Sequence, residues 1–108
     1  WNQLFLEFVT YATRHASFRA SLLARITARR DVHAQTLQQI ADATGRQLTV
    51  DPERLAQLMS ALANGLALDG LIDPDTAAQA LLREGFDAQW TFATRPPPTL
   101  GDCRVARG

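Results

Sequence analysis

Apolar side chains recur at helical spacing from the first residue onward. At 100° per residue, one broad face of residues 1–14 is apolar or aromatic, and the opposite face is polar. The apolar face comprises Trp1, Leu4, Phe5, Phe8, Val9, Tyr11, Ala12 and His15. This pattern predicts an amphipathic helix over residues 1–14.

A second helix is predicted over residues 17–44. Ser17 stands where an N-cap is expected, and Gly45 follows the end of the pattern as a glycine terminator. The apolar stripe of this helix consists of Phe18, Leu22, Ile26, His33, Leu37 and Ile40. Arg29 and Arg30 interrupt the stripe, and no cap separates the first two helices cleanly.

The third predicted helix has the clearest start. Asp51 suits the N-cap, Pro52 suits the first helical position, and Val50 is placed to pack on Leu55. Two stripes follow, about 100° apart, one of large residues and one of small residues. The large residues are Leu55, Met59, Leu62 and Leu66, and the small ones are Ala56, Ser60, Ala63, Ala67 and Gly70. A helix with both stripes has two sides to bury.

The fourth predicted helix repeats the Asp-Pro start. Gly70 offers a stop for the third helix, Asp73 an N-cap, Pro74 a first position, and Asp75 an anion in the first turn. The helix then runs to about residue 92. Along one side of it lie Ala78, Leu82, Gly85 and Gln89, and Leu81, Phe86 and Trp90 extend the apolar cover.

The pattern stops near residue 94. Residues 95–108 contain three prolines and scattered charge, which predicts a disordered tail. The expected fold is therefore an all-α bundle of about four helices over residues 1–94, followed by that tail. No stretch is expected to reach membrane-spanning length, and no membrane partner is predicted.

Composition narrows the functional classes. With 108 residues the chain is one domain, and its formal net charge of zero gives no overall attraction to nucleic acid or to an anionic membrane. The charge is uneven, with five arginines against one aspartate in residues 14–33. Residues 51–92 hold two arginines against seven carboxylates. Solvated helix faces explain this most simply, and a positive wall beside an acidic ligand is the alternative.

Enzyme chemistry finds little support in the sequence. No serine or cysteine nucleophile stands near a histidine and a carboxylate, and no glycine-rich phosphate loop is present. His15 and His33 lack the further ligands of a metal site. No catalytic residue, cofactor or metal is therefore predicted, although a small helical enzyme remains a third hypothesis. A single cysteine, Cys103, excludes an internal disulfide and favours a reducing compartment such as the cytoplasm.

The small stripe of the third helix permits close approach of another helix. One interpretation is a homodimer in which the last two helices of two copies form an intermolecular four-helix bundle. Its interface would comprise Ala56, Ser60, Ala63, Ala67, Gly70, Ala78, Leu82, Gly85, Phe86 and Gln89. The alternative is a monomeric bundle in which the first or second helix of the same chain covers the small stripe.

Two segments resemble the C-terminal regulatory domain of TetR-family transcriptional regulators. They read LFLEFVTYA (residues 4–12) and DPERLAQLMSALANGLALDGLIDPD (residues 51–75). The second includes a hydrophobic-Ala-x-x-Gly-Leu segment and an Asp-Pro-Asp corner, formed here by Leu62, Ala63, Gly65, Leu66, Asp73, Pro74 and Asp75. The resemblance covers about residues 4–90.

The resemblance implies a bacterial, ligand-responsive transcriptional repressor. Such a domain is all-α, dimerises through its last two helices and binds a small effector among the earlier ones. DNA binding would belong to an N-terminal helix-turn-helix domain that these residues do not include. An effector that is small and hydrophobic would contact Phe5, Phe8, Tyr11, His15, Leu22, Ile26, Arg29, His33, Met59 and Leu62. The alternative is a solid core formed by the apolar members of this set, with the Arg29 head group at the surface. The alternative function is a dimeric helical adaptor that binds a protein partner and has no effector cavity.

Overall fold

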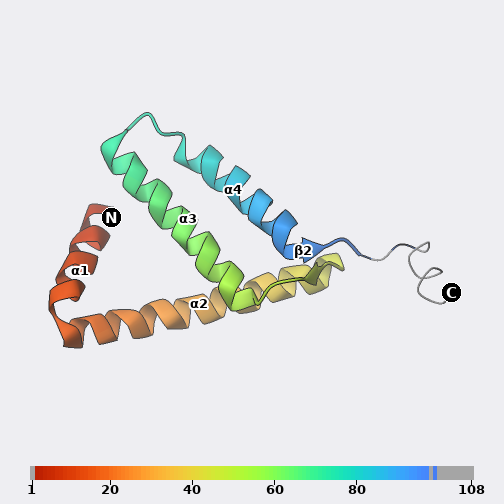
Figure 1. The fold of residues 1–108 in the computed structure, drawn as a ribbon, viewed down its shortest axis with the longest axis horizontal. Coiled ribbons are helices and arrows are strands. Elements are labelled where there is room, and N and C mark those ends of the chain that lie inside the picture. Colours follow the sequence, from red (N-terminus) through yellow and green to blue (C-terminus); the bar gives the residue numbers. More distant parts are fainter. Residues whose placement is uncertain (1, 98, 100–108) are drawn as a thin grey trace.

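One long helix organises the chain. In the computed structural model, which describes residues 2–97 and 99, this helix is α2 (Ala16–Thr44), and α1 (Asn2–Arg14) folds back from its N-terminal end (Figure 1). α3 (Pro52–Ile72) runs away from the second half of α2, and α4 (Ala78–Ala93) returns antiparallel to α3. The prediction of an all-α fold of four helices is confirmed.

The arrangement of these helices is thin. Its principal extents are 60 × 36 × 18 Å, and a helix with its side chains is about 10–12 Å wide. The shortest dimension therefore holds fewer than two layers of helix, and few side chains are enclosed. The buried apolar residues are Ala12, Ala34, Ala41, Leu55, Ala56 and Ala93. Among the described residues, Leu55 is the one large side chain that is fully buried.

A short strand pair that the apolar pattern does not predict ties the end of α4 to the loop after α2. β1 (Gln47–Leu48) pairs antiparallel with β2 (Thr94–Arg95), with Gln47 opposite Arg95. Next to the pair, the Arg46 Nε donates to the Thr94 Oγ1 at 2.8 Å, and the Thr49 amide donates to the Ala93 carbonyl at 2.8 Å. We call this set of contacts the clasp. Arg95, predicted to begin the disordered tail, is therefore part of a strand; residues 98 and 100–108 lie outside the described residues.

Two of the predicted helix boundaries have the expected local chemistry. Gly45 adopts a left-handed conformation with φ of +70°, which a glycine tolerates without strain, and the Arg46 amide donates back to the Ala41 carbonyl at 3.0 Å. At the start of α3, the Asp51 Oδ1 accepts a hydrogen bond from the Glu53 amide at 2.9 Å. The terminator at Gly45 and the cap at Asp51 are confirmed.

The start predicted for the fourth helix is wrong. Asp73 is the C-cap of α3, and its Oδ1 accepts from the amide of Asp75 at 3.0 Å, which closes a turn rather than a helix. α4 begins only at Ala78, so Pro74 and Asp75 lie in the connection. Gly70 does not end α3 either, because α3 continues to Ile72.

The cap predicted for the second helix is also wrong. α2 begins at Ala16, and the residue before it is His15, which has extended backbone with φ of −130° and makes no side-chain cap. Ser17 therefore lies inside the first turn, where its hydroxyl cannot act as the N-cap.

α3 is more apolar than the sequence analysis allowed for. Among the described residues it is the one helix long and apolar enough to cross a membrane, with a mean hydropathy of 1.3 over 18 residues. Only 11% of that window is buried inside the chain. The expectation that no stretch reaches membrane-spanning length is corrected, and most of the apolar surface of this helix is left without cover in the isolated chain.

Candidate functional site: a groove between α2, α3 and α4

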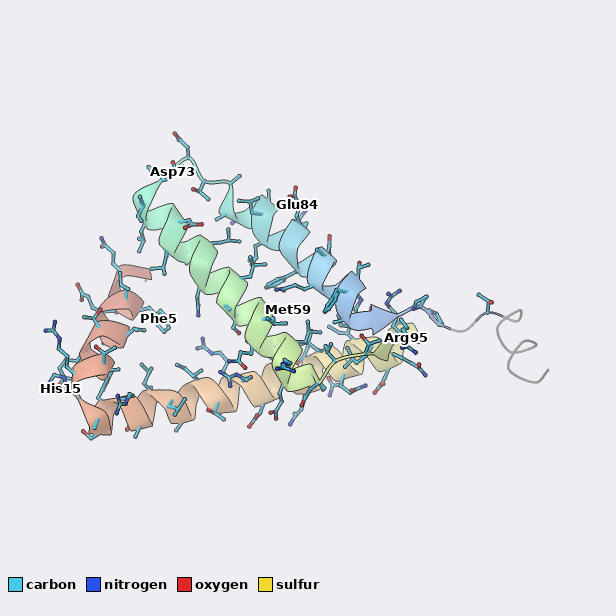
Figure 2. The ribbon with its side chains drawn as sticks, in the orientation of Figure 1. Phe5, His15, Met59, Asp73, Glu84 and Arg95 are labelled. Atoms are coloured by element: carbon cyan, nitrogen blue, oxygen red, sulfur yellow. The ribbon has the colours of Figure 1, made fainter. Side chains whose placement is uncertain are left out.

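An apolar groove of about 240 Å³ lies where three helices approach one another. Met59, which projects from α3 in Figure 2, is in its lining. The remaining lining comes from α2 (His33, Thr36 and Leu37), from α3 (Ala56, Ser60 and Ala63) and from α4 (Phe86). Because the side chains of Ala56 and Ala63 are short, space remains between the backbone of α3 and α2.

Close contact between α3 and α4 places Phe86 at this groove. An added Cβ at Gly85 would collide with the Leu62 side chain, so glycine at this position allows α4 to lie close to α3. One turn later, the Gln89 Nε2 donates to the Leu58 carbonyl at 3.3 Å. The Gln89 Oε1 is buried without a hydrogen-bond partner among the described residues. These contacts fix the position of α4 against α3 without any ion pair.

The groove contains few polar groups. No carboxylate and no arginine lines it, and His33 is its one titratable residue. The Thr36 Oγ1 donates to the Val32 carbonyl at 3.0 Å. In the described part of the chain, neither the His33 ring nor the Ser60 hydroxyl has a hydrogen-bond partner. The groove therefore offers a mostly apolar surface with one free polar group on its α2 side and one on its α3 side.

The structure divides the predicted effector residues into separate groups. His33 and Met59 meet in the groove, whereas Phe8 and Tyr11 belong to α1 and His15 lies at the joint between α1 and α2, at the far end of α2 (Figure 2). Eighteen residues separate His15 from His33, which is about 27 Å along a straight helix. A single small molecule cannot contact both histidines, so His15 and His33 do not share one site; that the other predicted residues bind an effector together stays a prediction.

The aromatic residues at that far end pack α1 on α2. Ring centroids of Tyr11 and Phe18 are 5.1 Å apart in an edge-to-face arrangement, and those of Phe8 and Phe18 are 6.1 Å apart. The His15 ring stacks on Tyr11 at 3.7 Å. The other predicted effector residues are scattered. Phe5 on α1 and Leu22 on α2 are half-buried, and Ile26 and Arg29 lie exposed along α2. Leu62 on α3 lies against Gly85 of α4.

Several residues predicted for a dimer interface are used within the chain instead. Ala56 is 1% exposed and has no surface left for a second subunit. Ser60, Ala63 and Phe86 line the groove. Gln89 is bonded to α3, as described above. The first half of the small stripe, Ala56 to Ala63, thus lies beside α2 of its own chain, whereas Gly70 at its end is exposed and an added Cβ there would meet no atom within 4 Å. Periodicity reveals such a stripe but cannot tell which neighbour it will meet. For the same reason Thr36 and Leu37 were not predicted as site residues, although Leu37 lies on the predicted apolar stripe.

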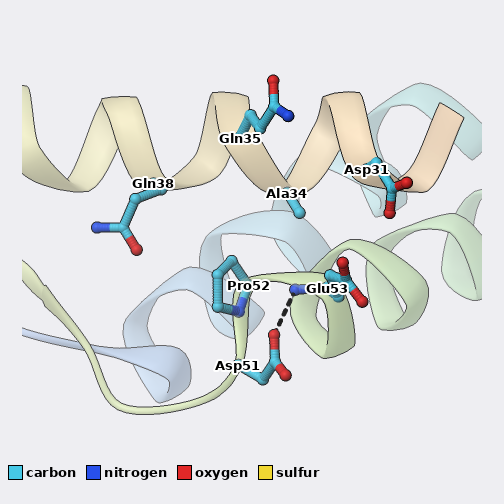
Figure 3. Close-up of a pocket in the computed structure, with 7 residues that line it drawn as sticks. All are labelled: Asp31, Ala34, Gln35, Gln38, Asp51, Pro52 and Glu53. Atoms are coloured by element: carbon cyan, nitrogen blue, oxygen red, sulfur yellow. Dashed lines mark hydrogen bonds between the residues drawn. The ribbon is translucent and has the colours of Figure 1, made fainter. Parts of the chain in front are cut away.

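A second, larger hollow of about 560 Å³ lies between α2 and the start of α3 (Figure 3). Asp31, Asp51 and Glu53 give it an acidic lining, together with Ala34, Gln35, Gln38 and Pro52. All three carboxylates are exposed, and Asp51 is engaged as the cap of α3. Solvation and capping account for these side chains, so the apolar groove is the better candidate for a binding site.

Comparison with known proteins shows the family of this chain. The family model described as "BetI-type transcriptional repressor, C-terminal", a TetR C-terminal model, matches residues 1–91. Searches of curated proteins and of solved structures found no match. The matched span includes all four helices except the last residues of α4. The chain therefore belongs to the TetR family of transcriptional regulators, as a C-terminal regulatory domain and not an enzyme.

Proposed function

We propose that this chain is the effector-binding and dimerisation domain of a ligand-responsive repressor that acts in the cytoplasm. The groove between α2, α3 and α4 would take the effector, and α3 and α4 would pair with those of a second copy. Operator DNA would be contacted by a helix-turn-helix segment, which these residues do not contain. The observation that carries the proposal is an exposed apolar surface along α3 and α4.

That surface, which we call the outer face, follows the spacing of a helix-pairing stripe. Its α3 residues alternate three and four positions apart, and its α4 residues lie on the flank of α4 beside them. The outer face comprises Leu58, Ala61, Gly65, Leu68 and Ile72 on α3, and Leu81, Ala88 and Phe92 on α4. Exposed fractions reach 86% for Ile72 and 77% for Phe92. An apolar stripe of this length on two adjacent helices is typical of a protein–protein interface.

The outer face replaces the interface predicted from the small stripe. At 100° per residue it lies on roughly the opposite side of α3 from Ala56 and Ser60, which face α2. Ala61, Gly65 and Ala88 are the small residues within it, and an added Cβ at Gly65 would meet no atom within 4 Å. A second copy related by a two-fold axis would therefore find room for its own large residues above Gly65.

A matched pair of alanine-to-glutamate variants tests the dimer. Ala61 lies on the outer face, whereas Ala80 is exposed on the polar side of α4. In sedimentation equilibrium, the parent chain and Ala80→Glu should have the mass of a dimer, and Ala61→Glu that of a monomer. A desolvated carboxylate without a partner costs several kcal/mol at such an interface. A monomeric parent, or a dimeric Ala61→Glu, would overturn the proposed interface.

The adaptor hypothesis gives a different result in the same experiment. An adaptor would reserve the outer face for a different protein, so the isolated parent would be a monomer whose mass does not change with concentration. The groove favours the regulator, because its lining of Met59, Phe86 and Leu37 beside free polar groups has the composition of a small-molecule site.

A further inference from the structure

The groove has a charge environment that restricts the chemistry of its ligand. Any cation that entered it would find no carboxylate in the lining, and Phe86 is the one aromatic ring there. Desolvating a cation without a counter-charge is unfavourable, and cages for quaternary ammonium groups generally use several aromatic rings. The lining therefore disfavours a cationic effector.

Two arginines lie on α2 one turn before the groove, outside its lining. Arg29 and Arg30 precede His33 by four and three residues, which places them one helical turn away on the same side of α2. Across the described residues, neither guanidinium has an ion-pair partner. Asp31, the nearest carboxylate in the sequence, lines the acidic hollow on the other side of the helix.

The size of the groove also limits the ligand. A volume of about 240 Å³ holds roughly eight non-hydrogen atoms, at the ~30 Å³ that a water molecule takes in the liquid. Apolar contact is available from Leu37, Met59, Ala63 and Phe86, while hydrogen bonding is available from His33 on one side and Ser60 on the other. A short amphiphile, with an apolar body and one polar head group, fits a groove with this apolar lining and these few hydrogen-bonding groups.

We propose that the effector is a small apolar carboxylic acid of about this size. Its carboxylate accepts from the His33 ring in the lining. The exposed Arg29, which lies outside the lining one turn earlier on α2, reaches the same carboxylate, and such a charge-assisted contact is stronger than one between neutral groups. Its apolar body lies between Met59 and Phe86, and the Ser60 hydroxyl donates to the second carboxylate oxygen. This inference rests on the proposed effector role of the groove and adds the class of ligand.

The single methionine of the sequence makes a direct test possible. The full chain, labelled with ¹³C at the Met59 methyl group, is titrated with three probes that share one tail: octanoate, octan-1-ol and octyltrimethylammonium. Octanoate should shift the Met59 resonance and bind at least about tenfold more tightly than the alcohol, because its head group is charged. The cation should bind most weakly.

Two matched pairs of variants locate the site. Arg29→Gln should weaken octanoate about tenfold and leave octanol unchanged, while Arg19→Gln, two turns and more away on α2, should change neither. Ala63→Phe should fill the groove and abolish binding of both probes, whereas Ala80→Phe on the polar side of α4 should not.

The outcomes separate the ligand class from the groove itself. If octyltrimethylammonium binds as tightly as octanoate, and Ala63→Phe abolishes both, the groove is a binding site but the acid is the wrong class. If octanoate binds equally well to the Arg29→Gln chain, the proposed head-group contact is wrong. If no probe shifts Met59, both the ligand class and the effector role of the groove are overturned, while the dimer remains to be judged by sedimentation.

Discussion

The two ends of α2 are held to the rest of the molecule in different ways. At the C-terminal end, Ala41 is completely buried and the clasp adds hydrogen bonds between segments almost fifty residues apart. At the N-terminal end, α1 is held mainly by aromatic contacts, and Tyr11 is still 50% exposed. Stability of the isolated chain is therefore concentrated at the clasp end, and α1 depends on a few exposed contacts.

The largest difference in stability between the two ends is expected from a pair of leucine-to-alanine variants. Leu55 is 1% exposed in the first turn of α3, and Leu55→Ala should lower the unfolding free energy by about 3 kcal/mol, because a cavity replaces the side chain. Leu23 on the first half of α2 is 57% exposed, and Leu23→Ala should change the same quantity by less than about 1 kcal/mol. Urea denaturation followed by circular dichroism, at one protein concentration, measures both. Equal losses would contradict the contrast between the two ends.

The hydroxyl of Thr94 should give the next largest effect. It accepts from Arg46 at 2.8 Å and donates to the Trp90 carbonyl at 2.7 Å, and the residue is 6% exposed. Thr94→Val keeps the shape but leaves the Arg46 charge without this acceptor, so the unfolding free energy should fall by about 1–2 kcal/mol. Thr13, exposed at the other end and bonded to the Thr10 carbonyl, is the control. Thr13→Val should stay within about 0.5 kcal/mol of the parent, and a comparable loss there would count against the clasp as the main anchor.

The two Asp-Pro sequences are expected to differ in their contribution to the unfolding free energy, by less than in the preceding pairs. Asp51→Ala removes the acceptor for the Glu53 amide at the start of α3 and should cost about 1 kcal/mol. Asp73→Ala removes an exposed turn contact and should cost no more than about 0.5 kcal/mol. Amide hydrogen exchange should quicken in the first turn of α3 for the first variant alone. A larger loss from Asp73→Ala would mean that this corner supports the fold more than its geometry indicates.

This pair also shows how much of the fold the sequence could predict. A cap at Asp51 and a terminator at Gly45 depend on neighbouring residues alone, and both were predictable. Asp73 carries the same signal as Asp51, but its carboxylate closes a turn with the Asp75 amide, and local sequence does not decide between the two outcomes. The β1–β2 pair was missed because two-residue strands have no periodicity, and their pairing depends on where α4 ends.

The candidate site follows the same division. His33 and Met59 were predicted as effector residues because both lie on inward faces, and both line the groove. Their predicted neighbours at the far end of α2 do not join them, since eighteen residues of helix, about 27 Å, separate His15 from His33. The small stripe was visible in the sequence, but burial of Ala56 against α2 depends on the crossing of two helices, which periodicity does not encode.

The smallest effect is expected at the joint between α1 and α2. The His15 ring stacks on Tyr11, and its Nδ1 lies 2.9 Å from the Tyr11 carbonyl, yet both residues are exposed. Water can replace these contacts, so His15→Ala should lower the unfolding free energy by less than about 0.5 kcal/mol. Because α1 has few other contacts, the variant should lower the free energy of local opening of α1 more than that of global unfolding. The amides of α1 should therefore exchange faster, and those of α3 should not. If exchange quickens equally in both helices, α1 unfolds together with the clasp end, and the two ends of α2 form one cooperative unit.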